Sequence, residues 1–131
     1  MKARIMIVDD DEPLRAAVKE ILTLDGYEMS EAGDVAGLRR AFDGPAPDAV
    51  ILDLSLPDGN GLAVLPELKQ KWPAAKVVIL TGYGTMDAAR EAYEQMEDVY
   101  FESKPFDAGL LKALLELALA GREVQSPKSK V

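Results

Sequence analysis

The sequence predicts an α/β fold in which a parallel sheet of five strands is covered by helices on both faces. Short apolar runs alternate five times with segments of helical period, as in repeated strand-helix units joined by right-handed crossovers. The runs at 5–8 and 77–80 are apolar at every position, which is typical of strands buried on both sides. With 131 residues, the chain fits one domain of ordinary size.

Each element follows from its local pattern. Strands are expected at residues 4–8, 27–31, 48–54, 76–80 and 98–102. The first helix carries apolar residues at the spacing of one buried face and ends at Gly26; these residues are Leu14, Ala17, Val18, Ile21 and Leu22. Further helices are expected at 34–43, 61–71, 85–96 and 107–120. The third helix contains Pro66, which should distort it unless the proline lies near the first turn.

The domain is expected to span residues 1–120. The remaining segment, 121–131, is polar and lysine-bearing, which is typical of a flexible tail or linker.

Charge and residue content exclude several classes of function. Fifteen Lys and Arg against 23 Asp and Glu give a net charge of −8, which repels phosphate backbones and acidic membrane surfaces. The sequence contains no Cys and no His, so it offers no thiolate, imidazole base or His metal ligand. No apolar run reaches membrane-spanning length, and the start lacks the core of a signal peptide. We expect a cytoplasmic protein that binds neither nucleic acid nor membrane through this domain.

Three carboxylates follow predicted strands. Asp9 and Asp10 end the first strand and Asp53 ends the third, so a parallel sheet brings them to the same edge. Carboxylates within roughly 4 to 6 Å of one another repel by about 1 to 4 kcal/mol per pair at an effective dielectric near 20, and a cation relieves this repulsion. An all-oxygen cluster without His or Cys suits Mg²⁺.

Two further polar residues reach the same edge. Thr81 follows the fourth strand and Lys104 the fifth. An Asp beside Mg²⁺ and Lys can attack phosphorus as a nucleophile, because both cations neutralise the phosphoryl oxygens. The hydroxyl of Thr81, with small Gly82 leaving room beside it, can bind a phosphoryl oxygen. The expected product is an aspartyl phosphate.

The stretches "IVDDDEPLR", "DAVILDLSLPDGNGL", "ILTGYGT" and "SKPF", in this order and spacing, resemble the receiver domain of bacterial two-component response regulators. The resemblance covers about residues 3–120, and "TGYGTMDAA" is closest in wording to receivers of the nitrogen-regulation type. It implies a doubly wound, flavodoxin-like (βα)₅ fold in three layers. It also implies Mg²⁺-dependent phosphorylation by a sensor histidine kinase or a phosphotransfer protein, with no enzymatic activity beyond self-phosphorylation and autodephosphorylation.

The resemblance implies metal-binding and phosphoryl-binding roles for individual residues of this sequence. Asp53 matches the phosphoacceptor of the family. Asp10 matches a direct metal ligand, Asp9 a ligand that acts mainly through water, and the carbonyl of Ser55 the third protein ligand.

The switch roles follow in the same way. Thr81 matches the family's switch hydroxyl and Lys104 its lysine, with Pro105 after a cis peptide bond. Ser55 and Tyr83 flank the expected path of hydrolytic water, so they are expected to set the lifetime of the phosphoryl group.

The segment 94–103 departs from the family pattern. It lacks the Gly-Ala pair that usually precedes the fifth strand and is about one residue longer than usual. The family's switch aromatic falls on Phe101, with Tyr100 adjacent, and both could equally be ordinary core aromatics. Glu102 occupies a position that is usually apolar. These departures fall on the output face formed by the fourth helix, fifth strand and fifth helix.

Other polar residues near the site have structural explanations. Asp11 and Glu12 precede Pro13, as a helix N-cap and a first-turn acid do. Gly59 and Gly61 are expected to be turn residues that do not cradle phosphate, since the glycine signature of nucleotide binding is absent.

The last helix is broadly apolar. Its leucines span roughly 200° of the helix, wider than the stripe of about 100° that faces one sheet. Either the tail covers this surface, or it contacts a partner, which would be a second copy or an output domain.

Two other functions would use the same acidic residues or the same fold. A Mg²⁺-dependent phosphohydrolase with an Asp nucleophile would need a second acid two residues later, where Ser55 stands, and a substrate cap, for which no segment is long enough. A pseudo-receiver would keep the fold without phosphorylation; the acids argue against it and the altered segment "VYFESKPF" leaves it open.

Overall fold

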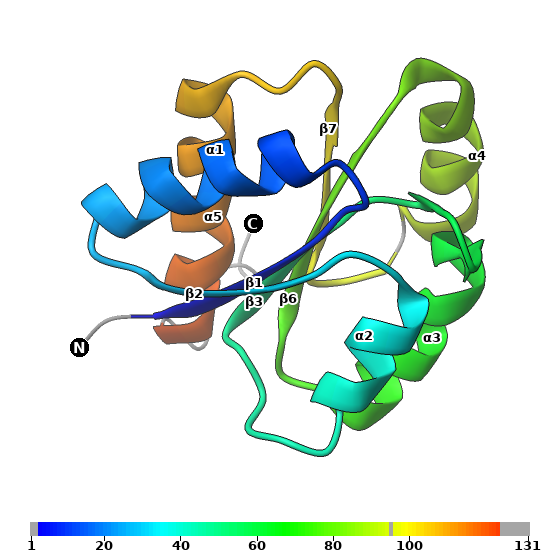
Figure 1. The fold of residues 1–131 in the computed structure, drawn as a ribbon, viewed down its shortest axis with the longest axis horizontal. Helices are drawn as coiled ribbons and strands as arrows, with labels where there is room; N and C mark the ends of the chain where they lie inside the picture. Colours follow the sequence, from blue (N-terminus) through cyan, green and yellow to red (C-terminus); the bar gives the residue numbers. More distant parts are fainter. Residues whose placement is uncertain (1–2, 95, 124–131) are drawn as a thin grey trace, which may run out of the picture.

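Five parallel strands form the central sheet of the computed structural model, which describes residues 3–94 and 96–123 (Figure 1). The strand order is β2-β1-β3-β6-β7, and every neighbouring pair is parallel. The strands are β1 (Arg4–Val8), β2 (Glu28–Ala32), β3 (Ala49–Leu52), β6 (Lys76–Thr81) and β7 (Val99–Ser103). The predicted doubly wound, flavodoxin-like fold is therefore confirmed.

Helices cover both faces of this sheet in three layers. On one face lie α1 (Glu12–Leu24) and α5 (Ala108–Glu123); on the other lie α2 (Val35–Ala41), α3 (Gly61–Lys71) and α4 (Tyr83–Tyr93) (Figure 1). A short hairpin of β4 (Ser55–Leu56) and β5 (Gly59–Asn60), which the sequence did not predict, precedes α3. Within the described ranges, no helix is long and apolar enough to cross a membrane.

Element ends differ from the prediction by a few residues. The strand β3 stops at Leu52, so Asp53 lies just beyond it, while β2, β6 and β7 each end one residue later than expected. The helix α4 begins at Tyr83 and ends at Tyr93, and α5 continues to Glu123. The first three residues of the predicted tail are therefore helical, and 124–131 lie outside the described residues.

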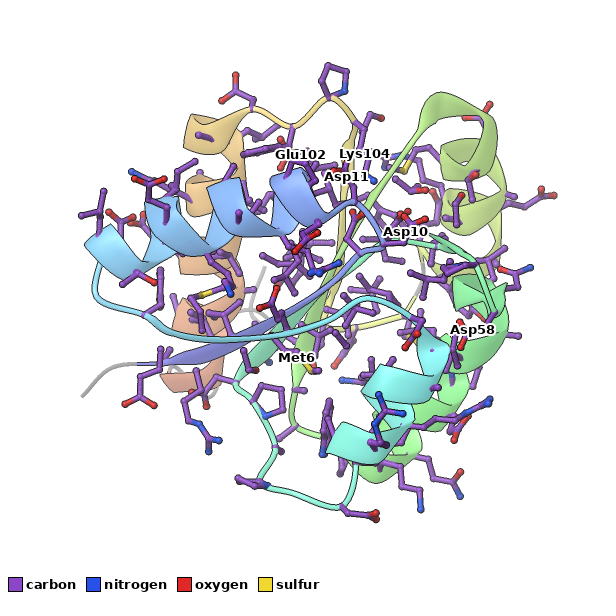
Figure 2. All side chains as sticks on the ribbon, in the orientation of Figure 1. Met6, Asp10, Asp11, Asp58, Glu102 and Lys104 are labelled. Carbon is purple, nitrogen blue, oxygen red and sulfur yellow. The ribbon has the colours of Figure 1, made fainter. Side chains whose placement is uncertain are left out.

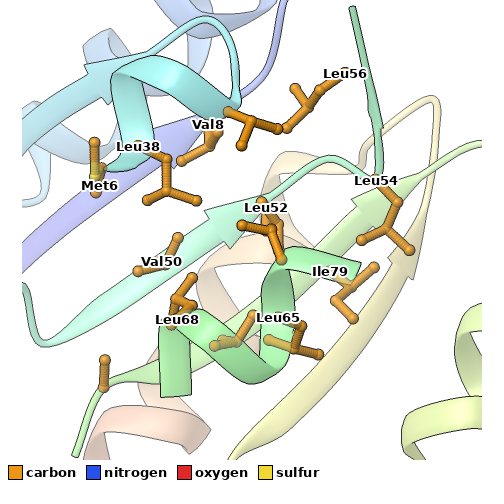
Figure 3. Close-up of a cluster of buried hydrophobic side chains, with 14 of the residues drawn as sticks. Met6, Val8, Leu38, Val50, Leu52, Leu54, Leu56, Leu65, Leu68 and Ile79 are labelled. Atoms are coloured by element: carbon orange, nitrogen blue, oxygen red, sulfur yellow. The ribbon is translucent and has the colours of Figure 1, made fainter. Parts of the chain in front are cut away.

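Side chains that alternate along each strand point to opposite faces of the sheet, and with the helices they form one hydrophobic core on each face. Leu38, Leu52, Leu65 and Ile79 belong to the cluster under α2 and α3 (Figure 3). The cluster under α1 and α5 contains Ile7, Val18, Leu22, Val78 and Leu115, all fully buried. Each such side chain contributes about 1.5 to 3 kcal/mol by leaving water, so the two cores fix the sheet that carries the polar edge.

The helix α3 continues through Pro66, which lies beyond its first turn. Proline has no N–H, so it cannot donate to the carbonyl of Leu62 one turn earlier. That carbonyl instead accepts a hydrogen bond of 2.5 Å from the hydroxyl of Tyr93, at the end of α4. A side chain of the neighbouring helix thus satisfies the group that the proline leaves free.

The unusual segment before β7 has a local explanation. Asp98 adopts a positive φ of 70°, a conformation that Gly takes freely and that Asp tolerates better than most residues. Its carboxylate also forms a 2.7 Å ion pair with Lys76, which is only 10% exposed. Asp98 therefore makes the turn without glycine, and β7 then pairs with β6 from Val77↔Val99 to Thr81↔Ser103.

Candidate functional site

Three carboxylates meet beyond the carboxyl ends of β1 and β3. Asp9, Asp10 and Asp53 each offer an oxygen, and these oxygens lie within 4.8 Å of one another. Asp9 and Asp53 are 1% and 3% exposed, whereas Asp10 faces solvent. Figure 2 shows Asp10, Asp11 and Lys104 at this edge of the molecule. The predicted convergence of the three acids is confirmed.

Hydrogen bonds hold the two buried carboxylates. One oxygen of Asp9 accepts from the N–H of Asp11 at 2.9 Å, and one oxygen of Asp53 accepts from the N–H of Ser55 at 3.1 Å. The second oxygens face Lys104, whose Nζ lies 2.8 Å from Asp9 Oδ2 and 3.2 Å from Asp53 Oδ2. One lysine therefore bridges two acids, and the cluster keeps an excess of negative charge.

Burial is the largest single influence on the pKa values of Asp9 and Lys104. Burial raises the pKa of Asp9, and the charge of Asp53 adds to the rise, although hydrogen bonds from Lys104 and Asp11 act in the opposite direction. Burial lowers the pKa of Lys104, but its hydrogen bond to Asp9 and the charges of both carboxylates outweigh burial, so the net pKa is raised. Lys104 therefore stays cationic at the site.

Thr81 lies at the end of β6, where it is fully buried. Its hydroxyl oxygen has no hydrogen-bond partner within the described part of the chain. Gly82 follows as the N-cap of α4, and a Cβ built at Gly82 would meet nothing within 4 Å, so there is open space here. The side chain of Tyr83 lies outside the described atoms. The peptide bond between Lys104 and Pro105 is cis, as the resemblance implied.

The loop after Asp53 is closely packed. Gly61 begins α3, and a Cβ there would lie 2.6 Å from Leu54 Cα and 3.0 Å from the carbonyl oxygen of Asp53. Such distances are too short for any side chain, so glycine is required by close approach rather than by a phosphate. Asp58, at the turn of the hairpin, accepts hydrogen bonds of 2.7 and 3.0 Å from the first two N–H groups of α2 (Figure 2).

The two aromatics of β7 face opposite sides of the sheet. Phe101 is half-buried against the core under α2 and α3, and the guanidinium carbon of Arg90 on α4 lies 5.1 Å from its ring centre. Tyr100 packs against the α1 and α5 core. Phe101 thus contacts α4, although it has no hydroxyl.

Glu102 is buried, with 4% exposure, at a position that is usually apolar. One of its oxygens accepts a 2.9 Å hydrogen bond from the N–H of Asp107 at the start of α5. Burial raises the pKa of Glu102, and the nearby charge of Asp107 adds to this effect, while the hydrogen bond opposes it.

Asp11 behaves as expected. It is the N-cap of α1, and its carboxylate accepts a 3.1 Å hydrogen bond from the N–H of Leu14, with Glu12 in the first turn. The sequence reasoning missed Arg15, whose Nη1 donates to the backbone carbonyl of Asp9 at 2.6 Å. Its place one turn after the N-cap was the available signal, since residues four apart share a helix face.

The donor set fits a hard divalent cation. Every candidate ligand atom is oxygen, and two of the three acids are buried while the third opens to solvent, as suits a cation that keeps some of its water ligands. This is the arrangement expected at the carboxyl edge of an open α/β sheet.

Residues 5–116 match the model of the family described as the response regulator receiver domain. The chain belongs to the response regulator receiver domain family. Receiver domains are the phosphorylation-activated switches of two-component systems, so the predicted signalling function is confirmed.

Relatives and solved structures agree with this membership. The DNA-binding transcriptional regulator NtrC of Proteus hauseri is 31% identical over 129 residues, covering 98% of this chain and 27% of that protein. The photosynthetic apparatus regulatory protein RegA of Rhodovulum sulfidophilum is 37% identical over 85% of this chain and 60% of its own length. NtrX from Brucella abortus has a TM-score of 0.85 at 34% identity, covering 98% of this chain and 29% of that one.

The receiver domain therefore spans only about a quarter of the NtrC relatives it matches. A CheY-like receiver domain protein from Methanospirillum hungatei JF-1 is comparable in length to this chain. The match covers 98% of that protein's chain, with a TM-score of 0.85 and 25% identity. The similarity to NtrC and NtrX receivers bears out the nitrogen-regulation wording of the sequence.

Proposed function

We propose that Asp53 accepts a phosphoryl group from the phosphohistidine of a sensor histidine kinase or a phosphotransfer protein. An oxygen of Asp53 forms a bond to phosphorus while the phosphorus–nitrogen bond of phosphohistidine breaks, and the imidazole nitrogen keeps the electron pair and is protonated by solvent. The observation that carries the proposal is the buried Asp53 carboxylate, with one oxygen held by the Ser55 N–H and the other facing Lys104.

Mg²⁺ is the proposed cofactor. Asp9, Asp10, Asp53 and the backbone carbonyl of Ser55 would hold it, with Asp9 acting mainly through water. The ion would supply positive charge to the phosphoryl oxygens. The clustered carboxylate oxygens and the general Mg²⁺ dependence of receiver domains support this assignment.

Lys104 and Thr81 are proposed to bind the transferred group. Lys104 already lies beside the second oxygen of Asp53, so it can follow a phosphoryl oxygen without crossing the site. The buried hydroxyl of Thr81 gains a partner when that oxygen arrives, and open space beside Gly82 allows the loop to move. A new hydrogen bond there draws the loop before α4 inward and shifts the population toward the active face.

The aromatics of β7, with Pro105 just beyond that strand, complete the proposed switch. Phe101, which packs under Arg90 of α4, is expected to move with that helix, and Tyr100 with the α5 side. Ser55 is exposed beside Asp53, in keeping with a role for Ser55 and Tyr83 in controlling hydrolytic water. Replacing either one without changing the phosphoryl lifetime would contradict this role.

The test is intact mass after incubation with Mg²⁺ and a small phosphodonor. Wild type and an Asp43→Ala control, which removes an exposed acid away from the site, should gain one phosphoryl group. Asp53→Ala should gain none. A gain that survives in Asp53→Ala would place the phosphoryl group elsewhere, and no gain in wild type would favour the pseudo-receiver. Continued turnover of a phosphate ester would favour the phosphohydrolase.

The output surface is proposed to be the face of α4, β7 and α5. The side chains of Leu110 and Leu117 on α5 are 49% and 60% exposed, which supports contact with a second copy or an output domain. Because NtrC relatives are longer proteins named as DNA-binding regulators, DNA contact by a longer form of this chain would come from another domain. The net charge of −8 supports the assignment of DNA contact to another domain, because it repels phosphate backbones. The expected compartment is the cytoplasm.

A further inference from the structure

Arg15 contacts the backbone beside the three clustered carboxylates, but it has no role in the proposed phosphoryl transfer. From the first turns of α1, its Nη1 donates to the backbone carbonyl of Asp9 at 2.6 Å, and its Nε donates to Glu31 on β2 at 2.8 Å. The side chain is only 16% exposed. The planar guanidinium thus makes two directed bonds at once, which the single ammonium of lysine cannot reproduce in the same geometry.

The guanidinium is itself held in place. The second oxygen of Glu31 forms an ion pair with Lys19, also on α1, and Lys19 and Arg15 together hold the pKa of Glu31 below its usual value. Gly33 lies against the guanidinium: a Cβ at that position would be 3.1 Å from Arg15 Nη1. The acid that anchors Arg15 therefore stays charged, and the space around the guanidinium is kept clear.

The bond to the Asp9 carbonyl has a consequence for Asp10. The carbonyl of Asp9 and the N–H of Asp10 belong to one rigid peptide plane, so fixing the carbonyl fixes the direction in which the chain enters Asp10. Asp10 is the exposed member of the acid cluster, and the charges of Asp9 and Asp53 tend to push its carboxylate away. Arg15 opposes that displacement through the backbone.

We propose that Arg15 is a positioning residue that holds the Asp9–Asp10 turn ready for Mg²⁺. The proposal rests on the proposed phosphorylation function for its biological meaning, but its physical effect is on metal binding. A nearby positive charge by itself repels Mg²⁺, so removing Arg15 would tighten binding if charge decided the outcome. Positioning predicts the opposite sign, which makes the two explanations separable.

The experiment is calorimetric titration of the folded protein with Mg²⁺. Arg15→Ala should weaken binding about tenfold, as loss of groups that orient metal ligands commonly does. Arg15→Lys keeps the charge but not both directed bonds, and its affinity should fall between those of Arg15→Ala and wild type. The matched control is Arg39→Ala. Arg39 on α2 also pairs with a glutamate, donating from Nε and Nη2 to one oxygen of Glu67 on α3 away from the acids, and its loss should leave Mg²⁺ affinity unchanged.

A second measurement uses phosphorylation by a small phosphodonor. Arg15→Ala should raise the Mg²⁺ concentration for half-maximal rate about tenfold, while the rate at saturating Mg²⁺ stays near that of wild type. A general loss of structure would instead lower the rate even at saturating Mg²⁺, and it should appear as a loss of the circular dichroism signal.

Three results would overturn the proposal: an Arg15→Ala protein that binds Mg²⁺ as tightly as wild type or more tightly, an Arg15→Lys protein equal to wild type, or an equal loss in Arg39→Ala. If Arg15→Ala does not fold, Arg15→Lys decides alone. Failure of the proposed function is distinguishable, because wild type would then bind Mg²⁺ with the predicted dependence on Arg15 but gain no phosphoryl group at Asp53.

Discussion

The hydrogen bond between Tyr93 and the carbonyl of Leu62 should be worth more than an ordinary tyrosine bond, because Pro66 leaves that carbonyl without its helical donor. The bond is 2.5 Å long and partly buried. Tyr93→Phe removes the donor and leaves an unsatisfied carbonyl, which costs about 1 to 3 kcal/mol when buried. Since this site is only partly buried, we expect a loss of about 1.5 kcal/mol in the free energy of unfolding.

Pro66→Ala changes this expectation. Alanine supplies an N–H to the carbonyl of Leu62, so the same Tyr93→Phe change then removes a second donor and should cost only about 0.5 kcal/mol. The difference, about 1 kcal/mol, is a coupling energy between two residues on different helices. It can be measured by urea unfolding of wild type, both single variants and the double variant, followed by circular dichroism.

Tyr100→Phe is the matched control. It removes a hydroxyl that makes no hydrogen bond within the described ranges, and it should change stability by less than about 0.5 kcal/mol. Equal costs of Tyr93→Phe in the wild-type and Pro66→Ala backgrounds would refute the reasoning, as would a cost no greater than that of the control. Either result would mean that the Leu62 carbonyl finds water or another donor.

Three other predictions concern the site and its surroundings. Gly61→Ala forces a Cβ against the backbone at Asp53, so the rate of phosphorylation at saturating Mg²⁺ should fall about tenfold or more in a protein that still folds by circular dichroism; an unchanged rate would show that the loop can yield. The pKa of Asp58 is lowered by the N–H groups at the start of α2, so its stabilising effect is present above the unfolded-state pKa and lost as pH falls through the lower folded value. Asp58→Asn should therefore lose less stability than wild type on acidification below about pH 4, and parallel losses would count against this. Burial raises the pKa of Glu102, so the folded state holds that proton more tightly, and stability is lost as pH rises from the unfolded value, about 4.3, through the folded value. Glu102→Gln, which can still accept the N–H of Asp107, should be more stable than wild type at neutral pH in urea unfolding; a less stable variant would mean that the charge is needed.

The sequence pattern predicted which acids meet at one edge of the sheet better than it predicted where the helices and strands end. Asp9, Asp10 and Asp53 could be placed together because parallel strands end at one edge, whatever their exact lengths. The extra hairpin after Asp53 could not be predicted, since its two-residue strands are too short to show a period. Element ends likewise depend on capping and tertiary contacts, which shift them by a few residues.

The departures from the family pattern needed tertiary contacts to be explained. Asp98 looks like an ordinary surface acid until its positive φ and its pair with Lys76 are seen. Glu102 breaks an apolar position, and only its bond to the N–H of Asp107 shows what it binds. Pro66 predicted a distorted helix, and the donor that satisfies the freed carbonyl comes from α4. None of these contacts leaves a periodic signal in the sequence, so no local pattern could reveal them.

The sequence alone therefore determined the fold, the family and the convergence of three carboxylates at one edge of the sheet, because these depend on hydrophobic period and on which residue types follow each strand. The tertiary structure decided how those groups are held: Lys104 between Asp9 and Asp53, and Arg15 on the carbonyl of Asp9. The physical reason is that periodicity sets which face of an element is buried, whereas a hydrogen bond or ion pair exists only where the folded chain brings a donor and an acceptor within about 3 Å.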